Sequence, residues 1–471
     1  MLPFEERNWL KMNQNYFNFV DHQELIRQFP TGPEFITKYN GMSSDELRNI
    51  QNGLFSNVME FAWKVPFYQR LWRSKGIEPS DIKNLDDITK LPVYSKSDLM
   101  ASVELYPPIG DFHGMQTYPK NKRPPLIFQT TSGTTGKPQP LLFGPKSREV
   151  QSLLLGRLYA LQGFSNEDVV HSVYGHGMVN GGHYVREAIN HWLGAQMLTA
   201  GTGVETRSEN QIAMMYGFKA TAIVGFGDFI KRLATVAREK GLEPGIDIPI
   251  KKISGHMGAE SKASMSEAWG GAEVYDWYGV GDTGAIAGEG PDHSGLHILE
   301  DAQFIELLDI DTADPVAEGA IGDMVCTCLF KDDIFPIIRF KTHDVSREVE
   351  GTNPLGLPFR RLEGFLGRSD NMVKLRGINI YPQSIGSILT EAFTVATGEF
   401  ICRVRREDGR EEMTAVIEAT RQENDVKAAM EATLRSRLGV GISVQLVKPG
   451  ETADLSGIET RQKPVRLIDE R

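Results

Sequence analysis

The sequence has few cysteines, no long apolar run and no excess of basic residues. Its 471 residues include only Cys326, Cys328 and Cys402, too few for a disulfide framework and without the nearby histidine that a zinc site would need. We expect these three side chains to be small core residues in a reducing compartment. The net charge is −11, and residues 371–471 are neutral. Nucleic acid is therefore not an expected partner, because nothing basic dominates either part.

Membrane and secretory signals are also missing. No apolar run approaches the roughly 18 residues of a membrane span, and the first residues lack the basic and apolar blocks of a signal peptide. We therefore expect a cytoplasmic protein with no membrane contact. A composition of 40% hydrophobic and 24% charged residues is typical of packed globular domains, and this length predicts two or three of them.

Local patterns predict an α/β fold with a large layered N-terminal domain of mixed sheets and helices, followed by a small α+β C-terminal domain. Ser43 and Glu46 have the spacing of a capping box before an amphipathic helix over residues 43–60. We predict a helical N-terminal region over residues 1–120, the core of the large domain over 121–369 and the C-terminal domain over 370–471. In the core, strands at 221–226 and 323–328 alternate with helices at 146–161 and 228–240. In the C-terminal domain, strands at 401–405, 413–418 and 443–447 surround a helix at 425–438 that stops at Gly439.

The strongest local motif is TTSGTTGKP, residues 130–138, which directly follows a short apolar run. Its two inner glycines let backbone amides turn toward an anion, its hydroxyls can donate to phosphate oxygens, and its lysine adds positive charge. It is not a Walker loop, because only two residues separate the glycines and a proline follows the lysine. A polar surface hairpin is the alternative interpretation. The candidate phosphate-binding residues are Thr131, Ser132, Gly133, Thr134, Thr135, Gly136 and Lys137.

A second motif, DWYGVGD at residues 276–282, offers a carboxylate for Mg²⁺ and two rings that could stack on a purine. A buried aromatic strand end followed by a glycine turn explains the same letters equally well. Because the whole protein carries a net negative charge, a polyphosphate site must supply its own cations or hold a metal ion.

Together with these two, three further motifs carry a family resemblance: GAE at 258–260, RFKTHD at 339–344 and GRSDNMVKLRGINIYP at 367–382. All five occur in the order and approximate spacing typical of the adenylate-forming superfamily of acyl-CoA synthetases. The chain most resembles the phenylacetate-CoA ligase branch, and the similarity extends to PFY at 66–68, LDDITKLPVYSKSDL at 85–99 and the ending RQKPVRLIDER. It therefore covers nearly the whole chain.

The resemblance implies an ATP-dependent acid-thiol ligase that uses ATP, Mg²⁺ and coenzyme A. In the family, a carboxylate attacks the α-phosphorus of MgATP, and the thiol of CoA then displaces AMP. The carried-over catalytic residues are Lys463, which would bridge the two reacting anions, and Asp282, which would ligate Mg²⁺. Besides the phosphate loop, the ATP site would contain Gly258, Ala259, Glu260, Asp276, Trp277, Tyr278, Gly279, Asp344 and Arg368. Residues 121–369 would be the adenylation core, and residues 370–471 would be a mobile lid with its hinge at Asp370. Lys374, Arg376 and Gly377 would face CoA.

A glycine-rich run at residues 173–183, VYGHGMVNGGH, corresponds to part of the family's acyl pocket. Its glycines allow close approach of a flat ligand, and its apolar side chains suit an aromatic acid. The substrate-binding candidates are Tyr174, His176, Gly177, Met178 and Gly258. Four histidines in and near this run have irregular spacing, so polar loop roles are favoured over metal ligation. One of them could hydrogen-bond a polar substituent of the acid.

Departures from the family pattern keep rival interpretations open. Gly281 and Asp282 stand where Ser/Thr-Glu is usual, and Asn371 replaces a second aspartate. The rivals are an adenylating enzyme with a non-CoA acceptor, and a nucleotide-binding module without turnover. The expected partners are an aromatic carboxylate, ATP and CoA; a homodimer is left open.

Overall fold

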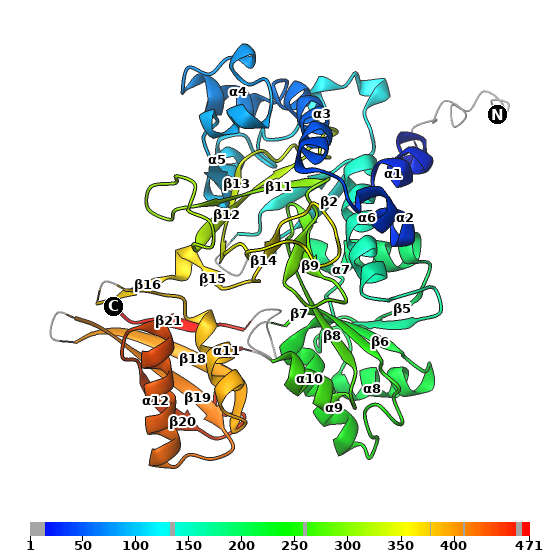
Figure 1. The fold of residues 1–471 in the computed structure, drawn as a ribbon. Helices are drawn as coiled ribbons and strands as arrows, with labels where there is room; N and C mark the ends of the chain where they lie inside the picture. Colours follow the sequence, from blue (N-terminus) through cyan, green and yellow to red (C-terminus); the bar gives the residue numbers. More distant parts are fainter. Residues whose placement is uncertain (1–14, 132–136, 258–260, 377, 408–409, 458–463) are drawn as a thin grey trace, which may run out of the picture.

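The computed structural model describes residues 15–131, 137–257, 261–376, 378–407, 410–457 and 464–471. Figure 1 shows a large body of helices and sheets and a smaller body, formed after β15, at one side of it. The fold is therefore mixed α/β, as the sequence predicts. No helix within the described ranges is long and apolar enough to cross a membrane.

Short helices form the N-terminal region of the large body. The predicted capping box is present at α3, where the Ser43 hydroxyl accepts from the Glu46 amide and the Glu46 carboxylate accepts from the Ser43 amide. That helix buries Leu47, Leu54 and Val58 on one face, which confirms the amphipathic prediction. The helices are α1 (His22–Gln28), α2 (Gly32–Tyr39), α3 (Ser44–Ala62), α4 (Pro66–Arg73) and α5 (Lys96–Leu105), with 3-10 segments at Tyr16–Phe19, Pro79–Asp81, Leu85–Lys90, Met115–Thr117 and Lys120–Lys122.

An eight-stranded sheet in the order β14-β10-β9-β8-β7-β6-β4-β5 is the framework of the large body. From β5 to β8 the neighbours are parallel, and from β8 to β14 they are antiparallel. The strands are β4 (Val169–Ser172), β5 (Gln196–Thr199), β6 (Ala222–Phe226), β7 (Lys252–His256), β8 (Glu273–Val280), β9 (Gly284–Glu289), β10 (Leu296–Ile298) and β14 (Arg361–Leu362). The helices α7 (Asn180–Glu187), α8 (Ser208–Gly217), α9 (Gly227–Glu239) and α10 (Lys262–Ala268) connect the parallel strands.

This topology places several loops at one edge of the sheet. Parallel strands joined by helices all end on the same side, and ligand sites of α/β proteins usually lie beyond those carboxyl ends. The glycine-rich run follows β4, α9 follows β6, residues 258–260 follow β7, and β8 carries the second motif to this edge. The central helix α6 (Pro145–Leu161), preceded by the hairpin β2 (Ile127–Thr130) and β3 (Pro140–Phe143), packs against β9, α7 and the π-helical turn Ala188–Leu193.

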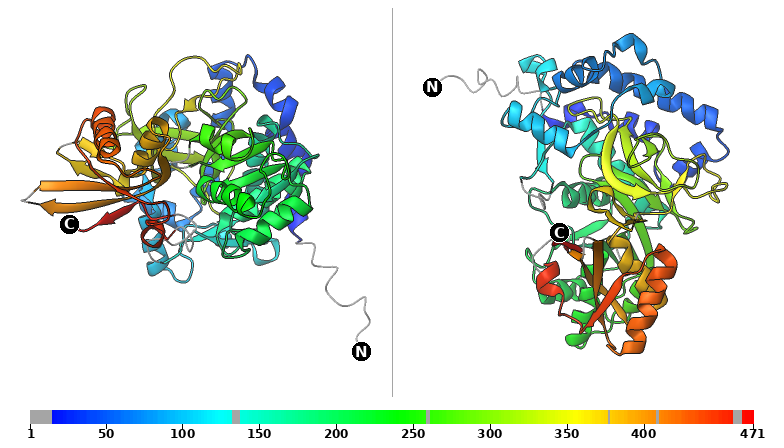
Figure 2. Two further views of the ribbon diagram at one scale, coloured as in Figure 1. Left: turned by 90° about the horizontal axis from the view of Figure 1, so that it is seen from below. Right: turned by 90° about the vertical axis from the view of Figure 1, so that its left-hand side faces the viewer.

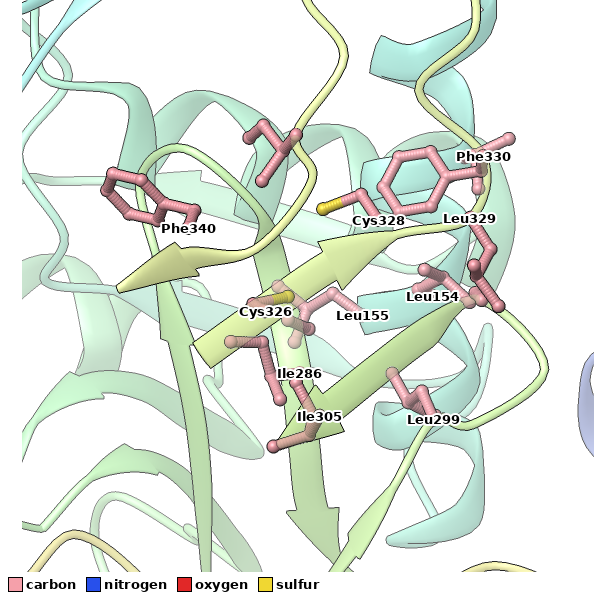
Figure 3. Packing of buried hydrophobic residues seen from close by; sticks show 14 of the residues in the cluster. Leu154, Leu155, Ile286, Leu299, Ile305, Cys326, Cys328, Leu329, Phe330 and Phe340 are labelled. Carbon is pink, nitrogen blue, oxygen red and sulfur yellow. The ribbon is translucent and has the colours of Figure 1, made fainter. Parts of the chain in front are cut away.

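A second sheet packs into the same core. Its strands are β1 (Tyr94–Ser95), β11 (Gln303–Leu308), β12 (Gly322–Cys328), β13 (Phe340–Ser346) and β15 (Gly367–Arg368). Every residue of β12 is buried, and Cys326 and Cys328 lie among Leu155, Ile286 and Phe340 (Figure 3). Together with the buried thiol of Cys402, they are free cysteines of the core, as predicted.

The smaller body has its own sheet, in the order β20-β19-β18-β21, with α12 against β20 and α11 against β18 (Figure 2). Helix α12 ends at Gly439, whose φ of 75° is the left-handed conformation that favours glycine. The predicted strands and helix are thus confirmed. The elements are the 3-10 turn Ser369–Asn371, β16 (Val373–Leu375), β17 (Ile378–Ile380), α11 (Gln383–Ala392), β18 (Ala396–Glu407), β19 (Arg410–Ala419), α12 (Asn424–Leu438), β20 (Ser443–Val447), α13 (Ala453–Ser456) and β21 (Leu467–Asp469).

Buried apolar residues of the two bodies form separate clusters. The cluster of the smaller body begins at Val373, and the clusters of the large body end at Leu362. The predicted boundary at 370 lies in this interval. The boundary at 120 lies in a stretch of turns and short 3-10 segments, but residues on both sides of it contribute to one core.

Candidate active site

The phosphate-loop motif joins two antiparallel strands. In this hairpin the Thr131 amide donates to the Gln139 carbonyl at 3.1 Å, and the Gln139 amide donates to the Thr131 hydroxyl at 3.2 Å. Thr131 is half-buried and Lys137 is exposed. Ser132, Gly133, Thr134, Thr135 and Gly136 lie outside the described residues, so the path of the loop itself stays a prediction.

Gln139 connects this hairpin to Asp282. The Gln139 side-chain amide donates to Asp282 Oδ1 at 2.6 Å, and both residues are buried. The Lys331 ammonium, also buried, donates to the Asp282 carbonyl at 2.9 Å. Burial raises the pKa of the Asp282 carboxyl, while the Gln139 hydrogen bond and the Lys331 charge act in the opposite direction. Sequence reasoning missed Gln139 and Lys331. Their only signals were a polar residue between two prolines and a lysine directly after the apolar pair Leu329-Phe330.

The Asp282 surroundings fit a magnesium ion held together with phosphates. Mg²⁺ is usually bound by one or two protein carboxylates, with substrate phosphates and water completing its oxygen ligands. Asp282 supplies one such carboxylate beside the phosphate-loop hairpin. Within the described part of the chain, no group of three or more histidine, cysteine, aspartate or glutamate side chains could form an all-protein metal site.

Asp344 is the centre of a second polar group. Tyr278 donates its hydroxyl proton to Asp344 Oδ2 at 2.7 Å, and Arg368 Nη1 donates to Oδ1 at 2.9 Å. Asp344 and Arg368 are register partners of β13 and β15. The same guanidinium binds both carboxylate oxygens of Asp370, at 2.8 and 2.6 Å. Burial and the Asp344 charge both raise the pKa of Tyr278, so its hydroxyl stays protonated and can donate. The structure therefore brings Tyr278, Asp344, Arg368 and Asp370 together.

Trp277 and Tyr278 lie on opposite faces of β8, because successive side chains of a strand alternate. Trp277 packs against Tyr174, with 6.2 Å between ring centroids, and against His256 at 4.3 Å. Tyr174 also contacts Phe226 at 5.2 Å. Trp277 thus lies with the acyl-pocket candidate Tyr174, while Tyr278 lies with Asp344. One purine cannot contact both rings.

Asp276 and Gly279 are the remaining candidates on β8. Asp276 is half-buried, and desolvation of its carboxylate, followed by the nearby Glu289 charge, raises its carboxyl pKa to about 7. Its Oδ1 accepts from the Met257 amide at 3.4 Å, just before residues 258–260. Gly279 packs so closely on β9 that a Cβ would lie 2.4 Å from the Gly284 carbonyl oxygen. Gly258, Ala259 and Glu260 lie outside the described residues.

The glycine-rich run lies beside the phosphate-loop hairpin. The Thr130 amide donates to the Met178 carbonyl at 2.7 Å, and Met178 itself is 53% exposed. His183 donates to the Gly177 carbonyl at 2.6 Å, and the His176 and His183 ring centroids are 5.9 Å apart. Burial, and then the neighbouring His183, lowers the pKa of His176. His176 is therefore a neutral imidazole near neutral pH.

The other candidates lie in the smaller body. Lys374 is exposed on β16, and Arg376 pairs with Glu412 at 2.7 and 2.8 Å. Gly377 and Lys463 lie outside the described residues. Lys463 is three positions before Arg466, which lies against the large body.

The chain is similar to known proteins in both sequence and structure. Residues 377–471 match the family model of the AMP-binding enzyme C-terminal domain. The phenylacetate-coenzyme A ligase of Aromatoleum evansii is 26% identical over 449 residues, with 91% of this chain and 96% of the relative covered. The enzyme of the same name from Thermus thermophilus is 25% identical, with 91% and 97% covered.

Among solved structures, 2-hydroxyisobutyryl-CoA ligase in the postadenylation state has a TM-score of 0.79 at 26% identity, covering 92% of this chain and 91% of that chain. The same ligase in the thioesterification state, with its adenylate and CoA, has a TM-score of 0.64 over the same shares of the chains. By class, the protein is an ATP-dependent ligase that forms AMP. The resemblance of the sequence to the adenylate-forming superfamily is confirmed by these comparisons.

Proposed function

We propose that the protein is an AMP-forming aryl-carboxylate:CoA ligase, which makes an acyl-adenylate from MgATP and then an acyl-CoA thioester. The curated relatives named above are phenylacetate-CoA ligases, and they match almost the full chain. Their activity supports an arylacetate or benzoate-type acid as the substrate class.

One observation carries the proposal. The six residues from Trp277 to Asp282 contact three groups of side chains: Trp277 contacts Tyr174, Tyr278 contacts Asp344, and Asp282 contacts Gln139 beside the phosphate loop. These correspond to the acyl, ribose and phosphate sides of an acyl-adenylate. In that molecule the reacting phosphorus lies between the acyl group and the ribose.

The roles of the described residues follow from this order. Asp344 would accept hydrogen bonds from the ribose hydroxyls, with Arg368 and Tyr278 fixing its orientation. Asp276, Tyr278 and Gly279, with residues 258–260, would line the adenine side. The loop that starts at Thr131 and includes Lys137 would hold the β- and γ-phosphates. Tyr174, Trp277, His176, Gly177 and Met178, with Gly258, would line the acid, and the aromatic rings around Tyr174 favour a flat aromatic group.

The first half-reaction brings two anions together. A carboxylate oxygen of the acid attacks the α-phosphorus, the bond to the bridging oxygen of pyrophosphate breaks, and pyrophosphate leaves. Fixed positive charge aimed at the reacting oxygens lowers the barrier, because it needs no reorganisation during the reaction. Lys463 would provide this charge from the lid. Mg²⁺, when bound with the phosphates at Asp282, would neutralise charge on the leaving pyrophosphate.

In the second half-reaction the CoA sulfur attacks the acyl carbon, the carbon–oxygen bond to AMP breaks, and the thiol proton is released. We propose that residues 370–471 form a lid that turns about Asp370 between the two steps, and that Lys374, Arg376 and Gly377 then face the thiol. Few hinge residues can complete two catalytic arrangements in this way. The 1–120 and 121–369 regions would together form the large domain, in a cytoplasmic protein whose partners are small molecules.

A screen of aromatic acids tests the proposal. Pyrophosphate release should depend on the acid, and AMP should be released in steady turnover only with CoA present. Exchange of labelled pyrophosphate into ATP without CoA-dependent turnover would instead indicate another acceptor. ATP binding without any exchange would indicate a nucleotide-binding module and would overturn the proposal.

A further inference from the structure

Arg466 of the smaller body reaches across to helix α9 of the large body. Its Nη2 donates to Asp228 Oδ2 at 2.9 Å, and the two side chains are 8% and 17% exposed. One helical turn further along α9, the Lys231 ammonium donates to the Thr397 carbonyl at 3.2 Å. Both contacts join the first turn of α9 to the start of β18 and the segment before β21.

Within its own body, Arg466 is held firmly. Its guanidinium binds both oxygens of Glu399, at 2.8 and 3.1 Å, donates to the Phe400 carbonyl at 3.0 Å, and lies 4.8 Å from the Phe400 ring centre. Bidentate pairing with a carboxylate is a strong, geometrically specific contact. Arg466 therefore keeps a counter-ion when Asp228 is withdrawn. The contact between the bodies can break without leaving a buried, unpaired arginine.

Asp228 lies at the edge of the sheet where the site is. It comes two residues after Phe226, whose ring packs against Tyr174 and His256. Lys463 precedes Arg466 by three residues in the sequence and lies outside the described residues. The ion pair with Asp228 therefore joins the segment that follows Lys463 to the large body, close in sequence to the acyl-side residue Phe226.

The arrangement of the two bodies gives independent support. The whole chain superposes better on 2-hydroxyisobutyryl-CoA ligase in its postadenylation state than on the same ligase in its thioesterification state, at equal identity. We therefore assign the ion pair between Asp228 and Arg466 to the relative placement of the two bodies that precedes acyl transfer to CoA.

We propose that Asp228 is a positioning residue for adenylate formation: its ion pair with Arg466 holds the lid in the arrangement that brings Lys463 to the reacting anions. The proposal rests on the function given above. Breaking the pair accompanies the change to the second half-reaction, so the pair assists the first step and is absent from the second.

Asp228→Ala tests this assignment, because it removes the contact from a partly exposed helix start and leaves the Arg466–Glu399 pair intact. Pyrophosphate exchange should fall about tenfold or more, the scale expected for losing a desolvated charge pair between two bodies. Thioester formation from synthetic acyl-adenylate and CoA should be unchanged or faster. Asp228→Glu should restore part of the exchange, since it returns the charge. Arg232→Ala, which breaks an exposed pair on the same helix, is the matched control and should leave both steps unchanged.

A measurement without turnover separates this inference from the proposed function. Dyes at Lys240→Cys and Lys448→Cys report the distance between the bodies, because the three native thiols are buried. Asp228→Ala should shift the energy-transfer distribution of the free protein away from the wild-type population, and Arg232→Ala should not. An unchanged distribution, or an equal loss of both half-reactions in Asp228→Ala, overturns the inference. Failure of the wild type to exchange pyrophosphate with any acid would overturn the proposed function, while the distance measurement would still test the ion pair as an anchor.

Discussion

The side-chain amide of Gln139 donates a 2.6 Å hydrogen bond to the carboxylate of Asp282. These residues are 143 positions apart, and the bond fixes the candidate metal ligand at the base of the phosphate-loop hairpin. This hydrogen bond also affects the pKa of the Asp282 carboxyl. Burial raises the Asp282 pKa, and Gln139 is the first of the contacts that lower it.

Gln139→Leu should move the acid limb of the pH–rate profile. The variant removes the donor, so the Asp282 pKa rises further above its ordinary value. A metal-binding carboxylate must be charged, and activity is lost as the pH falls through the pKa of the folded state. Pyrophosphate exchange should therefore fail at a higher pH than in the wild type, with the rate recovered at alkaline pH. Gln445→Leu, at an exposed position of β20, should leave the profile unchanged. Coincident profiles for Gln139→Leu and the wild type would refute the role of this hydrogen bond.

Lys463→Ala should separate the two half-reactions. If the lysine stabilises the first transition state, exchange of pyrophosphate should fall about 10²- to 10³-fold, the usual loss when one such donor is removed. Thioester formation from synthetic acyl-adenylate should be largely retained, because the lysine is then withdrawn with the lid. Lys448→Ala, an exposed lysine of the same body, is the control. Equal loss of both half-reactions would show that the lysine has no step-specific role.

Asp344→Ala should reduce discrimination between ATP and deoxy analogues of its ribose. A carboxylate oriented by Tyr278 and Arg368 can accept from both hydroxyls, and a hydrogen bond to a charged group contributes about 1.5–3 kcal/mol. The wild type should therefore have a kcat/KM for ATP roughly 10- to 100-fold above that for 2′- or 3′-deoxyATP. In the variant this ratio should approach one. A ratio that survives the substitution would place the ribose elsewhere.

Local signals made much of the fold predictable. The helix from Ser44 to Ala62 is specified by its capping box and its apolar spacing, and α12 by its spacing and the terminal Gly439. The strands of the smaller body could be predicted because they alternate along a continuous hairpin. Each of these signals lies within one segment, so no knowledge of distant partners was needed.

The contacts that build the site depend on distant partners. Tyr278 and Asp344 are 66 positions apart, and Asp228 and Arg466 are 238 positions apart. Neither sequence spacing nor residue type indicates that these pairs meet. The motif at 276–282 was predicted to present two rings to one ligand. Its residues 276–280 belong to the strand β8, and successive side chains of a strand alternate, so Trp277 and Tyr278 lie on opposite faces. Whether the two rings share a face therefore depends on how far the strand extends, which the motif alone does not show.

Removing one partner of a buried ion pair should strongly destabilise the large body. Arg157 on α6 donates to Asp301 at 2.8 Å, both side chains are fully buried, and Tyr39 donates to the other Asp301 oxygen at 2.8 Å. Asp301→Ala leaves the arginine buried without its counter-ion, which should lower the free energy of unfolding by about 3–5 kcal/mol. Breaking the exposed pair of Lys64 and Glu60 at the end of α3 by Glu60→Ala should cost far less, because exposed ion pairs typically contribute about 1 kcal/mol or less. Urea unfolding followed by tryptophan fluorescence measures the large body, because every tryptophan of the described residues lies there and none occurs after residue 277 of the sequence. Equal midpoints for the two variants would contradict this prediction.

His176 should affect the choice of acid rather than the chemistry. Its imidazole is kept neutral by burial and by His183, so it can exchange one hydrogen bond with a polar substituent without introducing a charge. Losing a neutral hydrogen bond typically costs about 0.5–1.5 kcal/mol. His176→Ala should therefore raise KM for a ring-hydroxylated arylacetate about 2- to 10-fold, and it should raise KM for the unsubstituted acid less. His293→Ala, which removes an imidazole stacked on Tyr275, should leave both KM values unchanged. An equal rise for both acids in His176→Ala would mean that the histidine shapes the pocket without recognising the substituent, because a purely steric wall contacts both acids alike.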